Sequence, residues 1–188
     1  MIAVWVIIGV IVLLFLWFIL AANGLVGRRN QVKNAWAQID VQLKRRHDLI
    51  PNLVQTVKGY MQYERVTLEA VTNARNLAQN AVGAGMGAQA KAEGELSGAL
   101  SHLLAVVERY PDLKANQNFV ALQEQLTSTE NQISFSRQYY TDSVRSYNNK
   151  IQMFPSNVVA NITGFKPAEF FEITVAAEKE APKVSFSQ

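Results

Sequence analysis

The stretch FVALQEQLTSTENQISFSRQYYTDSVRSYNNKIQMF, residues 119–154, decides the fold because one apolar column runs through all of it. The column recurs every seven residues without exception: Phe119, Leu126, Ile133, Tyr140, Tyr147 and Phe154. A strict seven-residue repeat keeps one face of an α-helix against its neighbours along a left-handed seam. We therefore predict one long helix over residues 115–154, which Pro155 ends.

A second column on this helix changes character along its length. It begins polar and ends apolar: Gln123, Glu130, Arg137, Val144 and Ile151. Two shorter helices, predicted at residues 64–82 and 88–110, reach only ~28 Å and ~35 Å, which is too short to cover the whole apolar column. Its distal half is therefore expected to meet the first long helix, the C-terminal tail or another subunit.

An apolar stripe also runs through residues 28–60, in alternating steps of four and three residues that indicate one face of a helix. Its members are Val32, Trp36, Ile39, Leu43, Arg46, Ile50, Leu53, Val57 and Tyr60. Pro51 lacks a backbone donor and disfavours helical geometry at Ile50. A kink or break is therefore expected at residues 47–51, and Gly59 is expected to end the element.

The two shorter helices lie between these long segments. Residues 64–82 have an inner face of small residues that lets a neighbouring helix approach closely: Val71, Ala74, Ala78 and Ala81. The glycine-rich GAGMG at 83–87 indicates a loop. Residues 88–110 carry the next stripe, Leu96, Leu100, Leu103, Val107 and Tyr110, and Pro111 is expected to stop this helix.

The fold class predicted from these patterns is all-α, since no run of residues alternates as a strand would. The helices of residues 28–155 are expected to pack their stripes together in antiparallel order as one bundle domain. Residues 156–188 are expected to form a short helix capped by Ser156 and then an extended tail. The apolar residues of the tail would dock on the bundle or on a neighbouring subunit: Phe165, Phe170, Phe171, Ile173 and Val184.

Residues 1–27 are expected to form a membrane anchor. Residues 2–22 contain no charge and no proline, and as a helix they span ~30 Å, the thickness of a bilayer core. Trp5 and Trp17 lie toward the two ends, as in an interfacial aromatic belt. A cleaved signal peptide is the alternative, but it would have a basic start and an apolar run of only ~7–15 residues.

The basic residues of the chain are concentrated just after this segment. Residues 28–58 contain seven Lys or Arg and two Asp, whereas the whole chain carries a net charge of only +3. Arg28, Arg29 and Lys33 are expected to contact lipid headgroups and to keep the domain in the cytoplasm, with the N-terminus on the other side of the membrane. Because the patch is so close to the apolar run, lipid rather than nucleic acid is the expected polyanion.

No motif for catalysis or cofactor binding stands out. The chain has no cysteine, and neither of its two histidines, His47 and His102, belongs to the Glu-x-x-His pattern of di-metal bundles. GAGMG lacks the lysine and the preceding strand of a phosphate loop, and no serine lies in Gly-x-Ser-x-Gly. We expect no catalytic residue, metal, cofactor or small-molecule substrate.

Arg46 is the one charged member of its stripe, and it needs a partner if it is buried. An unpaired guanidinium in a core is very costly, so we expect a structural ion pair, with Glu130 as the first candidate and Asp48 as the second. Lys44 and Arg45 lie off the stripe and are expected to be solvated or to face a partner. We interpret the basic run as a structural seam with a docking role rather than as a catalytic cluster.

Two long motifs resemble the LemA family of proteins. They are NAWAQIDVQLKRRHDLIPNLVQTVKGY at 34–60 and LSGALSHLLAVVERYPDLKANQNFVALQEQLTSTENQISFSRQYYTDSVRSYNNKIQMFPSN at 96–157. The resemblance extends over nearly the whole chain, to PKVSF at 182–186. It implies a bacterial, membrane-anchored protein with an antiparallel four-helix bundle and no established catalytic activity. It brings no family active site to transfer.

Three functions are compatible with these features. The first is a non-enzymatic scaffold that self-assembles at the membrane as a homo-oligomer, through residues 140–154 and the tail. The second is an adaptor or signalling subunit that presents the bundle to another membrane protein, such as a membrane protease. The third is an enzyme of unrecognised type. The residues expected at an interaction face are Lys44, Arg45, Tyr140, Tyr147, Phe154, Phe170 and Phe171.

Overall fold

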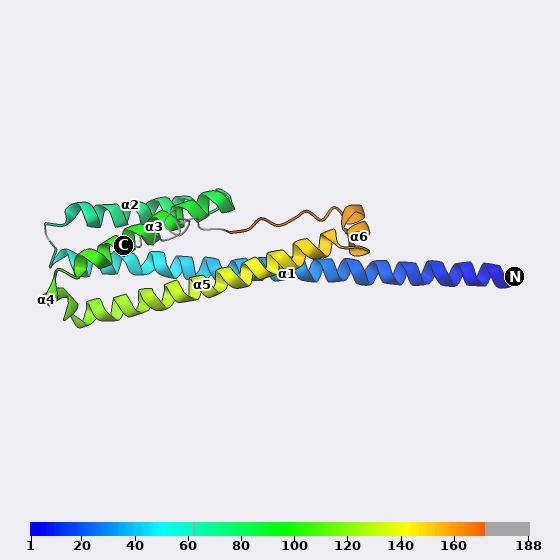
Figure 1. Ribbon diagram of the computed structural model, residues 1–188, viewed down its shortest axis with the longest axis horizontal. Helices are drawn as coiled ribbons and strands as arrows, with labels where there is room; N and C mark the ends of the chain where they lie inside the picture. The colour runs from blue at the N-terminus through cyan, green and yellow to red at the C-terminus, as the bar shows by residue number, and fades with distance from the viewer. Residues whose placement is uncertain (62, 172–188) are drawn as a thin grey trace, which may run out of the picture. The chain divides into compact units, whose positions relative to one another are not determined.

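The computed structural model describes residues 1–61 and 63–171, and these are all-helical, with no strand among them (Figure 1). The helices are α1 (Ile2–Lys58), α2 (Arg65–Asn80), α3 (Met86–Val107), α4 (Pro111–Lys114), α5 (Gln117–Gln152) and α6 (Ser156–Thr163). The all-α prediction is confirmed, as is one long apolar helix at the N-terminus. Residues 172–188, including Ile173 and Val184 of the expected tail, lie outside the described residues.

The described residues fall into two compact units. Unit 1 contains residues 1–41 and 133–170, and the described part of unit 2 contains residues 42–132, except 62, and Phe171. The long helices α1 and α5 each contribute one segment to each unit. The single bundle domain expected at residues 28–155 stays a prediction.

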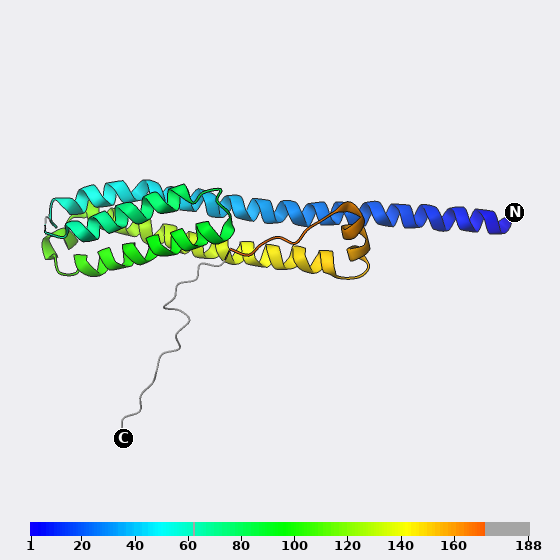
Figure 2. The ribbon, with the colours of Figure 1, turned by 90° about the horizontal axis from the view of Figure 1, so that it is seen from above.

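Unit 2 is built around a hydrophobic core to which α1, α2, α3, α4 and α5 all contribute. The small inner face predicted for α2 is present, since Val71, Ala74 and Ala78 are buried. These short side chains let α2 pack closely along α3, beside which it lies in both ribbon views (Figures 1 and 2). The other large residues of this core include Ile50, Leu53, Val57, Met61, Leu96, Leu103, Leu113 and Phe119.

The connection between α3 and α5 corrects one expectation about a proline. Pro111 does not stop the preceding helix, which already ends at Val107; it occupies the first turn of α4. A proline is tolerated there because the first backbone amides of a helix have no partner within it. Asn116 then caps the start of α5, since its side-chain oxygen accepts a hydrogen bond from the Phe119 amide at 3.1 Å.

In unit 1, the apolar run of α1 is fully exposed, and the helix is long and apolar enough to cross a membrane. A soluble core helix of this composition would be buried. Beyond the run, the rings of Trp36 on α1 and Tyr140 on α5 meet edge to face, with centroids 5.6 Å apart. The seven-residue column of α5 is buried from Phe119 to Tyr147, but Phe154 lies past the end of the helix and is 82% exposed.

The chain returns along α5 after α6, and we name residues 164–170 the return segment. The hydroxyl of Tyr147 donates to the Lys166 carbonyl at 2.9 Å, and that of Tyr140 donates to the Glu169 carbonyl at 2.8 Å. Asn148 exchanges two hydrogen bonds of 2.9 Å with the backbone of Ala168. Tyr140 and Tyr147 are therefore covered by α1 and by the chain's own return segment, whereas Phe154 stays exposed.

These contacts correct part of the expected interaction face. Tyr140, Tyr147 and Phe171 are each 2% exposed, so they are not available to a partner of the folded chain. Of the three neighbours expected for the distal half of the column, Tyr140 and Tyr147 meet the first long helix and the last segment of the chain, which accepts hydrogen bonds from both tyrosine hydroxyls.

The expected role of Ser156 is also corrected. Ser156 is the first residue of α6 rather than its cap, and its hydroxyl donates backward to the carbonyls of Lys150 and Met153. At the other end of α6, Gly164 adopts a left-handed conformation with φ of 73°. Glycine takes this conformation without a Cβ penalty, and it turns the chain into the return segment.

Candidate functional site

A cluster of ionisable side chains lies inside unit 2, and we name Arg46, His47, Glu93 and Glu130 the ionic cluster. Arg46 and Glu93 are both 0% exposed, and a guanidinium nitrogen of Arg46 pairs with the Glu93 carboxylate. The other terminal nitrogen lies 2.6 Å from Oε1 of Glu130 and donates to the Ser97 hydroxyl at 2.9 Å. One guanidinium on α1 thus joins two carboxylates, one on α3 and one on α5.

His47 completes the cluster from the next position on α1. It is only 4% exposed, and its Nε2 lies 3.0 Å from Oε1 of Glu93. That is ion-pair distance, although the two groups do not align as a good hydrogen bond. Burial is the largest single influence on the pKa of Glu93 and raises it, but the interactions with His47 and Arg46 together outweigh burial. The pKa of Glu93 is therefore lowered below its ordinary value, which keeps the carboxylate charged.

The helix continues through Pro51, so the expected break at residues 47–51 is absent. A proline at this position cannot donate to the carbonyl of His47, four residues earlier. The guanidinium of Arg75 on α2 supplies the missing donor, with its Nε 2.7 Å from the His47 carbonyl oxygen. A tertiary hydrogen bond therefore replaces the backbone bond that the proline removes, and it ties α2 to α1 beside the ionic cluster.

The structure also places the other residues singled out from the sequence. Glu130 is the expected partner that contacts Arg46, whereas Asp48 is exposed. Lys44 and Arg45 are exposed on α1, Phe154 is exposed, and Phe170 is 42% exposed. The three residues expected at lipid headgroups, Arg28, Arg29 and Lys33, are all exposed, and Arg29 lies 5.0 Å from the centroid of the Phe165 ring.

Sequence reasoning missed the most buried member of the cluster, Glu93, and its neighbour Ser97. A signal was present, because Glu93 lies three residues before Leu96 and therefore extends the apolar stripe of that helix by one step. A carboxylate on the stripe of one helix is the natural partner of a guanidinium on the stripe of another. Arg75 also lies between two buried positions of α2, Val71 and Ala78, but only the structure shows which acceptor it reaches.

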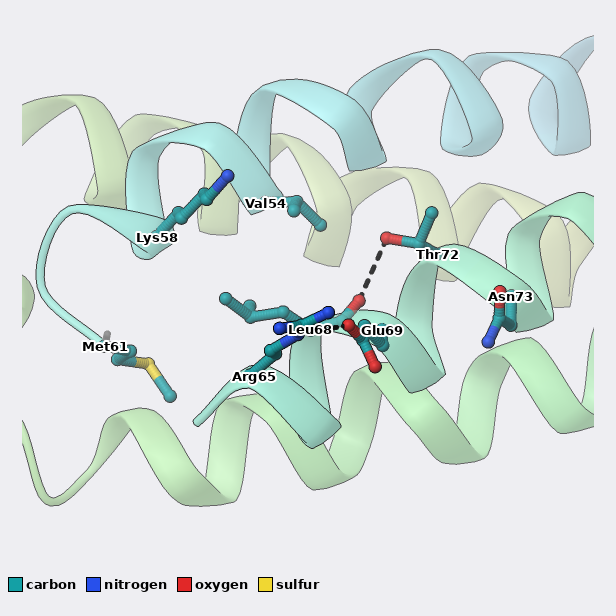
Figure 3. A pocket seen from close by; sticks show the side chains of 8 residues that line it. All are labelled: Val54, Lys58, Met61, Arg65, Leu68, Glu69, Thr72 and Asn73. Atoms are coloured by element: carbon teal, nitrogen blue, oxygen red, sulfur yellow. Dashed lines mark hydrogen bonds and ion pairs between the residues drawn. The ribbon is translucent and has the colours of Figure 1, made fainter. Parts of the chain in front are cut away.

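An open hollow of about 650 Å³ lies elsewhere in unit 2, between the end of α1 and the start of α2. Figure 3 shows the eight side chains that line it: Val54, Lys58, Met61, Arg65, Leu68, Glu69, Thr72 and Asn73. Its carboxylate, Glu69, pairs with Arg65 at 2.6 Å, and the Thr72 hydroxyl donates to the Leu68 carbonyl. The hollow therefore offers no nucleophile activated by a neighbouring base.

The ionic cluster has the composition of a catalytic site but not its accessibility. Arg46 and Glu93 are sealed from solvent, and the hollow at the start of α2 is lined by none of the cluster's residues. Within residues 1–61 and 63–171, no group of three or more histidine, aspartate or glutamate side chains is arranged to hold a metal ion. What the cluster does chemically is to fix three helices to one another through charge-assisted hydrogen bonds.

Comparison with known proteins identifies the family. The sequence model of the LemA family matches residues 35–186, which include every residue of the ionic cluster as well as Arg75 and Pro51. The chain belongs to the LemA family. The resemblance expected from the two long motifs is thereby confirmed.

Relatives of this LemA-family chain differ in how much of it they match. Protein LemA of Metamycoplasma hominis is 25% identical over 159 residues, which are 81% of this chain and 72% of the relative. Magnetosome protein MamQ 2 of Paramagnetospirillum magneticum is 37% identical over 81 residues, and magnetosome protein MamQ of Magnetospirillum gryphiswaldense is 34% identical over 80 residues. Each MamQ match covers 43% of this chain but only 30% and 29% of the respective relatives.

Proposed function

We propose that this LemA-family chain is a single-pass protein of the bacterial inner membrane whose helical units face the cytoplasm and present a binding surface to another membrane protein. The observation that carries the proposal is the apolar run of α1, of which no residue is buried, in a chain whose Arg46–Glu93 ion pair is 0% exposed. The basic residues just after the run, Arg28, Arg29 and Lys33, favour the cytoplasmic side for everything that follows. In unit 2, the proposed arrangement is an antiparallel four-helix bundle.

The proposal includes the absence of enzymatic activity. A catalytic base must reach the proton that it removes, and the buried carboxylate of this chain, Glu93, is 0% exposed and already bound to Arg46. The names of the LemA and MamQ relatives state no reaction. The ionic cluster is accordingly proposed to hold the helices in register rather than to act on a substrate.

An adaptor is favoured over a self-assembling scaffold by the return segment. Tyr140 and Tyr147 were the strongest reasons to expect contacts between copies, but their rings are buried and their hydroxyls are bonded within one chain. A single copy therefore needs no second copy to cover them. The exposed face of α1 that carries Lys44, Arg45 and Asp48 is the proposed docking surface in unit 2.

A self-assembling scaffold is the second candidate, and the exposure of Phe154 and Phe170 is the observation that favours it. The test is the mass of the full-length chain by light scattering, first in detergent and then in nanodiscs. A monomer in both supports the adaptor. A discrete oligomer that persists in both, and that Phe154→Ser with Phe170→Ser dissolves, supports the scaffold and overturns the adaptor.

Orientation has its own test, made simple by the absence of cysteine. Ala3→Cys lies at the N-terminal end of the apolar run, and Ser101→Cys lies at an exposed position of α3. In intact cells, a membrane-impermeant thiol reagent should label the first variant and spare the second until the cells are lysed. Labelling of Ser101→Cys alone in intact cells would reverse the proposed topology.

A further inference from the structure

Four exposed apolar side chains gather where α5 ends and α6 begins, and we name Met153, Phe154, Val158 and Ile162 the α6 patch. Their exposed fractions are 62%, 82%, 45% and 70%. Val158 and Ile162 lie four residues apart on one face of α6, while Val159 and Ala160 on the other face are buried in unit 1. A helix that is apolar on both faces has one face for its own protein and one for something else.

The position of the patch along α1 indicates what that second partner is. Tyr140 on α5 packs on Trp36 of α1. Seven residues further along α5, the ring of Tyr147 contacts the ring of Phe165. The guanidinium of Arg29, seven residues before Trp36 on α1, lies over the same Phe165 ring. Phe154 follows Tyr147 by seven residues, just past the end of α5, and Ala22, the last residue of the uncharged apolar run, precedes Arg29 by seven residues on α1. Both ribbon views place α6 beside α1 (Figures 1 and 2). The patch is therefore level with one edge of the apolar run.

The charges nearest the patch are mainly basic, although Arg145 pairs with Asp142 at 3.1 Å. Between Ser143 and Ala168 the chain carries Arg145, Lys150 and Lys166 and no carboxylate. On α1, the charged side chains between Ile2 and Ile39 are Arg28, Arg29 and Lys33, again all basic. α6 itself carries no charge. Exposed apolar side chains surrounded by lysine and arginine are the composition of a surface that seats on an anionic bilayer.

We infer that the α6 patch is a second membrane contact, through which unit 1 seats on the anionic surface of the same bilayer that α1 crosses. Phe154, Val158 and Ile162 enter the boundary between headgroups and acyl chains, while the exposed Lys150 and Lys166 meet lipid phosphates. The return segment holds α6 in place from the opposite side through Tyr147 and Asn148. The inference rests on the proposed membrane crossing of α1.

The experiment places one environment-sensitive fluorophore on the full-length chain in vesicles of phosphatidylcholine and phosphatidylglycerol. The test positions are Phe154→Cys and Ile162→Cys, both exposed, so that the label does not disturb a core. Phe135→Cys is the matched control, because Phe135 is an aromatic residue of α5 in unit 1 that is 67% exposed and about 28 Å back along the helix. Leu13→Cys reports on the apolar run itself.

Quenchers then distinguish lipid from water. A nitroxide carried on the lipid chains should suppress emission at 154 and 162 to an extent comparable with position 13, and dissolved acrylamide should suppress emission only at 135. If positions 154 and 162 behave like 135 while position 13 is quenched by lipid, the second contact does not exist and the membrane anchor stands. If position 13 itself escapes the lipid quencher, the proposed membrane crossing fails.

Two further measurements separate lipid from a second copy and test the charges. If the fluorophores at positions 154 and 162 are protected from both quenchers, and if this protection is lost when the chain is diluted with lipid, the patch is a contact between copies. That result would overturn the inference. Vesicles of phosphatidylcholine alone, or Lys150→Gln with Lys166→Gln, should reduce lipid quenching at 154 and 162 without changing it at 13. Unchanged quenching in both cases would overturn the anionic part of the inference.

Discussion

Replacing Glu93 by glutamine should destabilise unit 2 much more than replacing Glu130, the other carboxylate that contacts Arg46. The change keeps the shape of the side chain and removes its charge. Arg46 then stays 0% exposed with Glu130 as its remaining carboxylate partner, and the side chain of Glu130 is 40% exposed. Water screens that pair, so it does not compensate for a guanidinium that remains buried.

The expected magnitudes follow from burial. Breaking a buried pair by removing one partner costs about 3–5 kcal/mol, whereas an exposed or screened pair is worth less than ~1 kcal/mol. At about 2–4 °C per kcal/mol for a chain of this size, Glu93→Gln should lower the melting temperature by roughly 6–20 °C. Glu130→Gln should lower it by at most ~4 °C by the same conversion.

The assay is thermal unfolding of the full-length chain in mild detergent, followed by far-ultraviolet circular dichroism. A third variant, Arg46→Met with Glu93→Leu, removes both buried charges together and should be more stable than Glu93→Gln, because no uncompensated charge remains. Equal losses for Glu93→Gln and Glu130→Gln would refute the reasoning. The reasoning would also be refuted if the stability lost in the double variant equalled the sum of the losses in Arg46→Met and Glu93→Leu, since the two residues would then be energetically uncoupled.

Three other predictions concern the neighbouring contacts. Arg75→Met should lower the stability by about 1–3 kcal/mol, because it leaves the His47 carbonyl without a donor. The loss should be smaller in a Pro51→Ala background, where the backbone amide of residue 51 supplies the donor. The same melting curve measures both losses, and equal losses in the two backgrounds would contradict the role of Arg75. Because the pKa of Glu93 is lowered in the folded chain, its stabilising effect should be present above the ordinary carboxyl pKa of 4.5 and be lost as the pH falls below that value. When melting temperature is measured against pH, it should fall more steeply in acid for the parent than for Glu93→Gln. Burial raises the pKa of Tyr140 and Tyr147 above 10.0, so the stability that these tyrosines contribute should persist up to that pH and be lost above it. Hydrogen exchange of the backbone amides at residues 165–170 should also be faster in Tyr147→Phe than in Tyr139→Phe, the matched variant of an exposed tyrosine. Equal exchange rates would show that the Tyr147 hydroxyl does not hold the return segment.

The sequence predicted the helices well because their signals are local and repeat many times. The column on α5 needs only a period of seven, and its five members from Phe119 to Tyr147 are all buried. The small face of α2 likewise depends on nothing beyond the spacing of Val71, Ala74 and Ala78. The partner of Arg46 was named from the same kind of register, since Glu130 lies on the column that flanks the apolar one.

The errors arose where a distant segment alters a local rule. Pro51 breaks a helix when nothing replaces its missing donor, and the sequence has no sign that Arg75, 24 residues later, supplies one. Tyr140 and Tyr147 were assigned to contacts between copies because the position of the return segment was not predicted. That position depends on a turn at Gly164, and a single turn leaves no periodic signal in the sequence. Glu93 was missed for a different reason. The apolar stripe predicted for residues 88–110 was taken to begin at Leu96, three residues after Glu93.

The register role proposed for the ionic cluster follows from how uniform the faces of the helices are. The inner face of α2 is nearly smooth, and the stripes of α1 and α3 repeat at similar spacing, so apolar packing alone distinguishes weakly between alignments shifted by one heptad. A guanidinium that must meet carboxylates on α3 and α5 at once does distinguish them, because any shift leaves buried charges unpaired. On this reasoning the double variant that lacks Arg46 and Glu93 should be stable and yet poorly defined, with helical circular dichroism like the parent's but broadened hydrogen-exchange protection across α1 and α3. A double variant as uniformly protected as the parent would show that the apolar stripes alone specify the register.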